Sequence, residues 1–120
     1  MKTFTSLQEI QLLLANGDIS LAELVSDYIK KISNSKTNSF IEVFESEAII
    51  KAKEITDKIK LGNQGSLAGM VIGIKDNLCY KNHKSSGASK ILENFESIFT
   101  ATAIERLIAE DAIILGRLNC

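Results

Sequence analysis

A lysine that directly follows an apolar run is the first feature of this sequence that could do chemistry. Lys75 ends the run in "LAGMVIGIKDN" (residues 67–77) and is followed by Asp76 and Asn77. In open α/β sheets, ligands bind in the crevice outside the carboxyl ends of the strands. A lysine desolvated there can be neutral near pH 7 and act as a general base. The residues alone favour a simpler interpretation, a solvated strand end, because strands commonly finish in polar residues.

Two further candidates for nucleophilic catalysis are weaker. His83, the only histidine, lies in the polar stretch "YKNHKSSG", and no serine stands in the G-x-S-x-G elbow of a serine–histidine–aspartate triad. We therefore predict a solvated loop histidine. Ser33 and Lys36 have the S-x-x-K spacing of β-lactamase-type enzymes, but the companion motifs are missing, so chance explains this spacing better.

The glycines and cysteines indicate structure rather than a ligand site. Gly65, Gly69 and Gly73 lack the pattern of a dinucleotide or phosphate loop, and we predict a tight turn and close strand packing instead. Cys79 and Cys120 are too few for a disulfide framework or a zinc site, and free thiols suit a reducing compartment. We expect no cofactor or metal to be bound by this chain.

Length and charge place the chain among globular proteins. Its 120 residues, 45% hydrophobic and 24% charged, suffice for one compact domain. The 14 basic and 15 acidic side chains nearly cancel and form no blocks, so no nucleic-acid or anionic-membrane surface is indicated. No apolar run approaches the roughly 18 residues of a spanning helix. We expect a cytoplasmic protein without a membrane partner.

Two helices are predicted near the amino end of the chain. The first is capped by Thr5 or Ser6 and ends at Gly17, and the second opens with a capping box at Ser20. Both have apolar residues at helical spacing on one face. We expect them to form a helical hairpin within residues 1–34.

The remaining elements alternate between strands and helices. A third helix is predicted over residues 46–61, and a fourth opens with a capping box at Thr102. Short apolar runs predict strands at "FIEVF" from Phe40, "MVIGI" from Met70 and "AIILG" from Ala112. The last two lack polar alternation, which is typical of parallel strands covered on both faces. The order strand, loop, helix, strand predicts a right-handed βαβ crossover.

These elements give an α/β class and a single, partial domain. Residues 1–34 form its helical part and residues 39–120 its α/β part. The chain stops soon after the run at Ala112, which should be a central buried strand, whereas domains usually end in exposed segments. We expect the sequence to be the truncated, N-terminal part of a larger domain.

The second half of the chain resembles a known family. The similarity lies in "LAGMVIGIKDNLCYKNHKSSGASKILENF", followed by "TATAIERLIAEDAIILGRLN". Both stretches resemble the start of the amidase signature family. "ASKILENF" together with the "AT..ERL" segment favours its branch of A subunits from tRNA-dependent glutamyl/aspartyl amidotransferases. The resemblance implies the N-terminal portion of the amidase signature fold, an α/β fold with a mixed sheet covered by helices.

The resemblance also implies a mechanism and partners. The family's catalytic lysine falls on Lys75, which would be the general base of a triad with a cis-serine and a nucleophilic serine. Attack on the side-chain amide of glutamine would release ammonia, which a channel passes to the B subunit. There ATP, with Mg²⁺, activates Glu-tRNA(Gln) or Asp-tRNA(Asn), and a small C subunit holds the other two together. This chain would meet tRNA only through the complex.

The two serines of that triad are absent from this sequence. Both belong to a glycine- and serine-rich stretch expected beyond Cys120, and Ser85, Ser86 and Ser89 lie in a different family segment. Because triad members act as a unit, we predict that these 120 residues alone have no glutaminase activity. Two alternatives stay open: a stand-alone small-amide hydrolase of the same family, and a non-catalytic docking or structural module.

Overall fold

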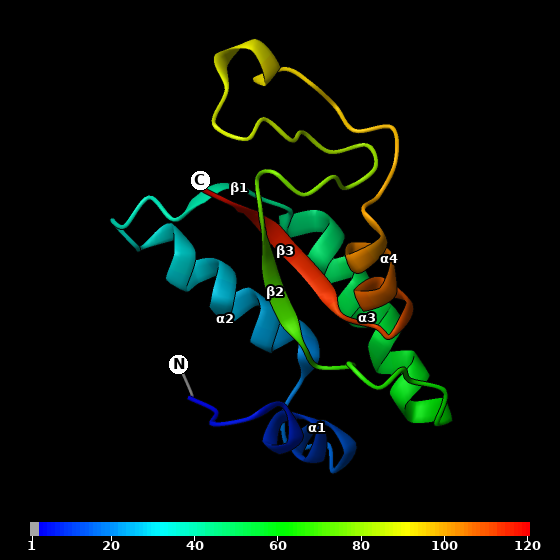
Figure 1. Ribbon diagram of the computed structural model, residues 1–120. Coiled ribbons are helices and arrows are strands. Elements are labelled where there is room, and N and C mark those ends of the chain that lie inside the picture. The colour runs from blue at the N-terminus through cyan, green and yellow to red at the C-terminus, as the bar shows by residue number, and fades with distance from the viewer. Residues whose placement is uncertain (1–2) are drawn as a thin grey trace.

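The computed structural model describes residues 3–120 as an α/β arrangement of helices around a small sheet (Figure 1). All of the predicted helices and strands are present. In chain order the elements are α1 (Leu7–Ala15), α2 (Leu21–Ser33), β1 (Phe40–Val43), α3 (Glu45–Leu61), β2 (Val71–Lys75), a 3-10 turn (Lys90–Leu92), α4 (Thr102–Ala109) and β3 (Ile113–Leu118).

Local capping explains where most of the helices begin and end. Ser6 and Ser20 each accept a hydrogen bond from the backbone N–H three residues on, as predicted. Gly62 ends α3 in the left-handed conformation, with φ at +74°. The predicted cap of α4 is wrong. Thr102 already lies within that helix, and its N-cap is Ala101, which makes no side-chain capping bond.

The sheet is mixed, with β3 in its centre and the strand order β1-β3-β2. β2 and β3 run parallel, and Val71 lies opposite Ile113 and Lys75 opposite Leu118. These two strands with α4 between them form the predicted βαβ connection. β1 pairs antiparallel with β3 on the other side. The carboxyl ends of β2 and β3 therefore lie side by side at the same end of the sheet.

The two parallel strands differ in burial. Residues 113–117 of β3 are all buried, which confirms the prediction of a covered central strand. In β2 only Ile74 is buried, so the prediction of a strand covered on both faces is wrong for this one. Among residues 3–120, β2 lies at the edge of the sheet with no strand beyond it.

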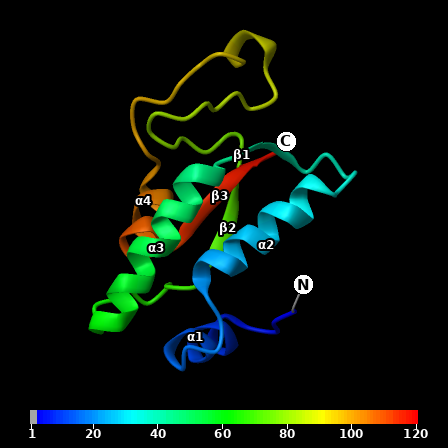
Figure 2. The same cartoon turned by 180° about the vertical axis from the view of Figure 1, so that it is seen from behind.

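The core consists of two apolar clusters on β3. Ile113 and Leu115 pack against α2 and α3, which Figure 2 shows lying in front of β3. Ile114, between them in sequence, packs with Ile104 of α4, Ile74 of β2 and Phe44. Successive side chains of a strand point to opposite faces, so Ile113 and Leu115 belong to one cluster and Ile114 to the other, on the opposite face of β3.

The predicted helical hairpin is not the main packing arrangement. α2 packs chiefly along α3, whereas α1 contributes no buried residue and lies at the periphery. The apolar stripe of α2 is buried by α3 and β3 at Leu21, Leu24 and Val25. The first two residues of the expected 1–34 unit lie outside the described residues.

A long loop, residues 76–101, connects β2 to α4 and extends away from the body of the molecule beyond the carboxyl end of β2 (Figures 1 and 2). It contains the 3-10 turn and one isolated β-bridge, between Lys84 and Glu96. No helix within residues 3–120 has both the length and the apolar character that a bilayer crossing requires.

Candidate functional site

Lys75 is the last residue of β2 and its side chain is exposed. Within residues 3–120, that side chain makes no hydrogen bond or ion pair. The structure therefore places the lysine at the carboxyl end of a parallel strand, as predicted. It does not show the desolvation that a neutral lysine would need.

The alternation of the strand explains why Lys75 points outward. Its neighbours Ile74 and Asp76 are both buried, at 3% and 0% exposure. Side chains two residues apart share a face, so burial of these two turns the lysine to the opposite side. Lys75 is thus flanked in sequence by two buried side chains, Ile74 and Asp76.

Asp76 is the most completely bonded side chain in this region. Its Oδ1 accepts hydrogen bonds from Arg117 Nη1 and from the backbone N–H of Ser86, the latter at 3.2 Å, and its Oδ2 accepts from Ser86 Oγ. Ser85 Oγ donates to the Asp76 carbonyl at 2.9 Å. Sequence reasoning ruled out Ser85 and Ser86 as triad serines, and the structure shows both hydroxyls committed to Asp76.

Arg117 links the ends of all three strands. It lies on β3, pairs with Asp76 just beyond β2, and its Nε donates to Glu42 Oε1 of β1 at 3.0 Å. Its side chain is only 8% exposed, whereas that of Glu42 is 46% exposed. The buried guanidinium thus connects β3 to a carboxylate of β1 and to one just beyond β2 through charge-assisted hydrogen bonds.

The Asp76 carboxyl stays ionised despite its burial. Desolvation acts to raise its pKa, but hydrogen bonds from Ser86 and Arg117 and the positive charge of Arg117 outweigh it, so the pKa is lowered. Sequence reasoning missed this network. The signal that could have found it is the position of Asp76 and Arg117, which follow and end two strands predicted to be parallel.

His83 is not the solvated loop residue that the sequence predicted. Its ring stacks on Tyr80 with centroids 4.0 Å apart and lies 4.5 Å from the ring of Phe44. Its Nε2 is 2.7 Å from Glu47 Oε2 and its Nδ1 is 2.8 Å from the carbonyl of Lys81. Both ring nitrogens are thus engaged: Nε2 connects the loop to the start of α3, and Nδ1 makes a contact within the loop itself.

Tyr80 shares this aromatic cluster. Burial, together with the negative charge of Glu47, raises the pKa of its phenol. The cluster therefore holds the beginning of the long loop against α3 by apolar and polar contacts.

The remaining candidates have structural roles. Ser33 Oγ donates to the carbonyl of Ile29 within α2, as expected for a chance S-x-x-K spacing. Gly65 begins a turn, as predicted, and a Cβ there would lie 2.5 Å from the backbone carbonyl of Glu110, so the close contact is with another turn and not with a strand. Cys79 and Cys120 are free thiols.

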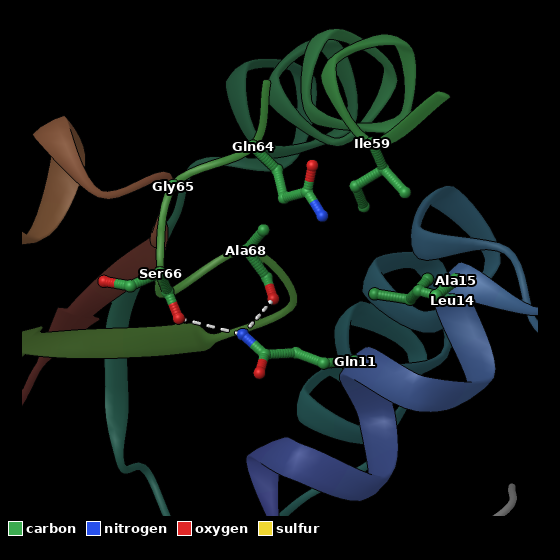
Figure 3. Close-up of a pocket in the computed structure, with 8 residues that line it drawn as sticks. All are labelled: Gln11, Leu14, Ala15, Ile59, Gln64, Gly65, Ser66 and Ala68. Atoms are coloured by element: carbon green, nitrogen blue, oxygen red, sulfur yellow. Dashed lines mark hydrogen bonds between the residues drawn. The ribbon is translucent and has the colours of Figure 1, made fainter. Parts of the chain in front are cut away.

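One pocket is lined from α1, α3 and the turn before β2 (Figure 3). Its volume is about 290 Å³, and Gln11 Nε2 reaches into it to donate to the carbonyls of Ser66 at 2.9 Å and Ala68 at 3.0 Å. These residues precede β2, so the pocket lies at the opposite end of the strand from Lys75. Its donor is already satisfied by backbone carbonyls.

Metal-binding groups are not gathered anywhere within residues 3–120. No set of three or more histidine, cysteine, aspartate or glutamate side chains is arranged to hold an ion there. The chemical features at the carboxyl end of β2 are the exposed amine of Lys75 and the buried ion pair of Asp76 with Arg117.

Sequence comparison relates most of the chain to one family. The family model described as "Amidase" matches residues 23–120. A curated relative from Chlorobium phaeobacteroides (strain BS1), named as the A subunit of glutamyl-tRNA(Gln) amidotransferase, is 41% identical over 118 residues, which is 97% of this chain and 25% of the relative. A relative of the same name from Bacillus mycoides (strain KBAB4) is 40% identical over 116 residues. The chain spans about a quarter of the length of these relatives.

Solved structures show the same fold. A bacterial aryl acylamidase of the amidase signature family matches with a TM-score of 0.87 and 25% identity, over 96% of this chain and 25% of that one. A peptide amidase from Stenotrophomonas maltophilia matches with a TM-score of 0.86 and 24% identity, over 96% and 24% of the two chains.

Proposed function

This chain belongs to the amidase family, and we propose that it supplies the catalytic lysine of an amide-hydrolysing subunit in a tRNA-dependent amidotransferase. The observation that carries the proposal is the position of Lys75. It stands exposed and unpaired among residues 3–120 at the carboxyl end of a parallel strand, above a buried anchor. The name shared by the curated relatives supports the choice of this subunit.

The proposed reaction is hydrolysis of the side-chain amide of glutamine. The amine of Lys75 accepts a proton through a cis-serine, and the nucleophilic serine attacks the amide carbon. The carbon–nitrogen bond breaks, the nitrogen leaves as ammonia, and water then hydrolyses the acyl-serine to glutamate. Both serines are proposed to come from polypeptide outside these 120 residues. That polypeptide would also cover Lys75 and remove it from water.

The proposed partners follow from the amidotransferase reaction. Ammonia would pass to the B subunit, which uses ATP and Mg²⁺ to activate Glu-tRNA(Gln) or Asp-tRNA(Asn), with the C subunit holding the complex together. The cytoplasm is the proposed location, because this is where tRNA is used. The near balance of 14 basic and 15 acidic residues supports a subunit that contacts tRNA only through its partners.

A stand-alone amidase is the second candidate. The observation that favours it is structural similarity to an aryl acylamidase and a peptide amidase, whose names mention no tRNA. Co-purification separates the two candidates. A component of the amidotransferase should be isolated with the B and C subunits, whereas a stand-alone amidase should be isolated free of both.

The test is ammonia release from glutamine. The complete encoded protein, isolated with its partners, should hydrolyse glutamine and amidate misacylated tRNA, and the 120-residue chain alone should do neither. Hydrolysis of small aryl or peptide amides without any turnover of glutamine would support the stand-alone amidase. Turnover of glutamine by the 120 residues alone would contradict the proposed division of the triad.

A further inference from the structure

We propose that Asp76 is a positioning residue for Lys75, and that its bonds to Arg117 and Ser86 fix the direction in which β2 presents the lysine. This inference rests on the proposed function, since it assigns a role in that reaction to a residue that does not react itself. Asp76 faces the interior while Lys75 faces outward, so it acts through the backbone.

Two segments hold Asp76, the strand β3 and the long loop. β3 contributes the guanidinium of Arg117 and the carbonyl of Leu118, which accepts the Asp76 N–H at 3.0 Å. The loop contributes the side chains of Ser85 and Ser86 and the N–H of Gly87, which donates to the Asp76 carbonyl at 3.1 Å. Every polar atom of Asp76 therefore has a partner.

Within the described part of the chain, the Lys75 side chain is not held by any polar contact of its own. Its side chain has no bonding partner within residues 3–120, so the direction of its Cα–Cβ bond depends on the backbone alone. That backbone is fixed by pairing with Leu118 on one side and by Asp76 on the other. Loss of the Asp76 bonds would free the strand end next to the lysine.

Burial of a charged side chain at this position has a free-energy cost. Asp76 is 0% exposed, and a buried carboxylate is costly unless it is paired and fully hydrogen-bonded. An apolar residue of similar size could fill the same space without that requirement. A carboxylate that binds β3 and the loop at once gives directional bonds instead, which packing alone does not supply.

The molecule contains a matched control for this claim. Asp111 is also buried, at 2% exposure, and it also combines a cation, Lys58 at 2.8 Å, with a backbone N–H, that of Gly65 at 2.7 Å. It lies before β3, at the other end of the parallel pair from Lys75. A substitution there also removes a buried, ion-paired carboxylate, but at a place remote from the lysine.

The experiment compares Asp76→Asn, Asp111→Asn and Lys75→Ala in the complete encoded protein, isolated with its partners. Steady-state amide hydrolysis is measured, and kcat is corrected for the folded fraction found by circular dichroism. We expect Asp76→Asn to lower kcat about 100-fold with KM nearly unchanged, because misplacing a reacting group by about 1 Å costs that much. Asp111→Asn should keep kcat within about 3-fold, since it leaves the reacting geometry intact.

Two results overturn the inference in distinguishable ways. If Lys75→Ala abolishes hydrolysis while Asp76→Asn retains the wild-type kcat, or loses no more than Asp111→Asn, the positioning role fails and the proposed function stands. If Lys75→Ala is fully active, the proposed function fails and the positioning role fails with it.

A milder pair decides the matter where Asp76→Asn does not fold. Ser86→Ala deletes one hydroxyl donor to Asp76, whereas Ser86→Thr keeps it. We expect Ser86→Ala to lower kcat about 10-fold and Ser86→Thr to restore most of that loss, at equal folded fraction. Equal kcat for the two variants would contradict the positioning role.

Discussion

The two ends of the parallel strand pair each hold a buried aspartate, but they hold it differently. Asp76 follows β2 at the carboxyl end, and Asp111 precedes β3 at the amino end. Arg117, the partner of Asp76, has 8% of its side chain exposed, whereas Lys58, the partner of Asp111, has 46% exposed. In the first ion pair both side chains are therefore buried. In the second the carboxylate is buried, but its lysine partner is partly in solvent.

The difference matches what each end has to do. At the amino end, Asp111 adopts a φ of +71° in the turn between α4 and β3, and its carboxylate closes the approach to Gly65. Glu110 reinforces this closure by accepting two hydrogen bonds from Ser66, at 2.9 Å each. The amino end is thus closed by its own contacts. The carboxyl end is equally well bonded beneath the surface, yet it leaves Lys75 free above it.

The largest expected effect on stability comes from removing the positive charge that is paired with each buried aspartate. Arg117→Met should lower the free energy of unfolding by about 3 kcal/mol, because it leaves the buried Asp76 carboxylate without its charge partner. Lys58→Met should cost only about 1 kcal/mol, since its ammonium is half exposed. Chemical denaturation of the two variants measures both values. Equal losses would show that the two ion pairs are equivalent and would contradict the difference drawn from their exposure.

A smaller difference is expected from the glycines near each end. A Cβ at Gly65 would lie 2.5 Å from the Glu110 backbone, whereas one at Gly73 would lie 3.0 Å from the Leu118 side chain. Because a side chain can move and the backbone of a closed turn cannot, Gly65→Ala should cost about 2 kcal/mol and Gly73→Ala about 1 kcal/mol. The midpoints of thermal unfolding give the order, and the reverse order would contradict the rigidity ascribed to the amino end.

The smallest expected effect is on the free energy of unfolding at acidic pH. Desolvation acts to raise the pKa of both Asp76 and Asp111, but hydrogen bonds and the paired cations outweigh it and lower each pKa below the ordinary 3.8. The unfolded chain therefore binds more protons than the folded one in this range, and the stabilisation is complete above pH 3.8 and lost as the pH falls below it. Each carboxylate contributes a slope of at most about 1.4 kcal/mol per pH unit.

Variants check the assignment of this slope. Asp76→Asn and Asp111→Asn should each flatten the fall in the free energy of unfolding below pH 3.8, relative to the unchanged protein. The readout is denaturant unfolding at a series of pH values. An unchanged acid slope in Asp76→Asn would mean that this carboxyl is not held ionised by its partners.

The sequence predicted most of the elements because their signals are local. Apolar spacing and the caps at Ser6, Ser20 and Gly62 place three helices, and unbroken apolar runs place β2 and β3. The predicted cap of α4 was wrong because a capping motif is short. The main partner of α2 is α3, which is distant in sequence, and the pattern of α2 alone could not identify it.

The candidate site was predictable only in part. The strand end at Lys75 followed from one apolar run, but the bond from Arg117 to Asp76 spans 41 residues and depends on the parallel register. His83 was assigned to solvent because polar neighbours surround it in sequence, whereas the fold brings Phe44 and Glu47 onto it. Contacts between distant segments carry no periodic signal that a single sequence displays.

We propose that Lys75, at the carboxyl end of β2, takes part in the reaction and that Lys58, near the other end of the strand pair, does not. The most direct measurement is kcat/KM for amide hydrolysis by Lys75→Ala and Lys58→Ala in the complete encoded protein. We expect a loss of about 10³-fold or more for Lys75→Ala, because a general base is removed, and a change within about 3-fold for Lys58→Ala. Wild-type kcat/KM in Lys75→Ala, or an equal loss in both variants, would contradict this proposal.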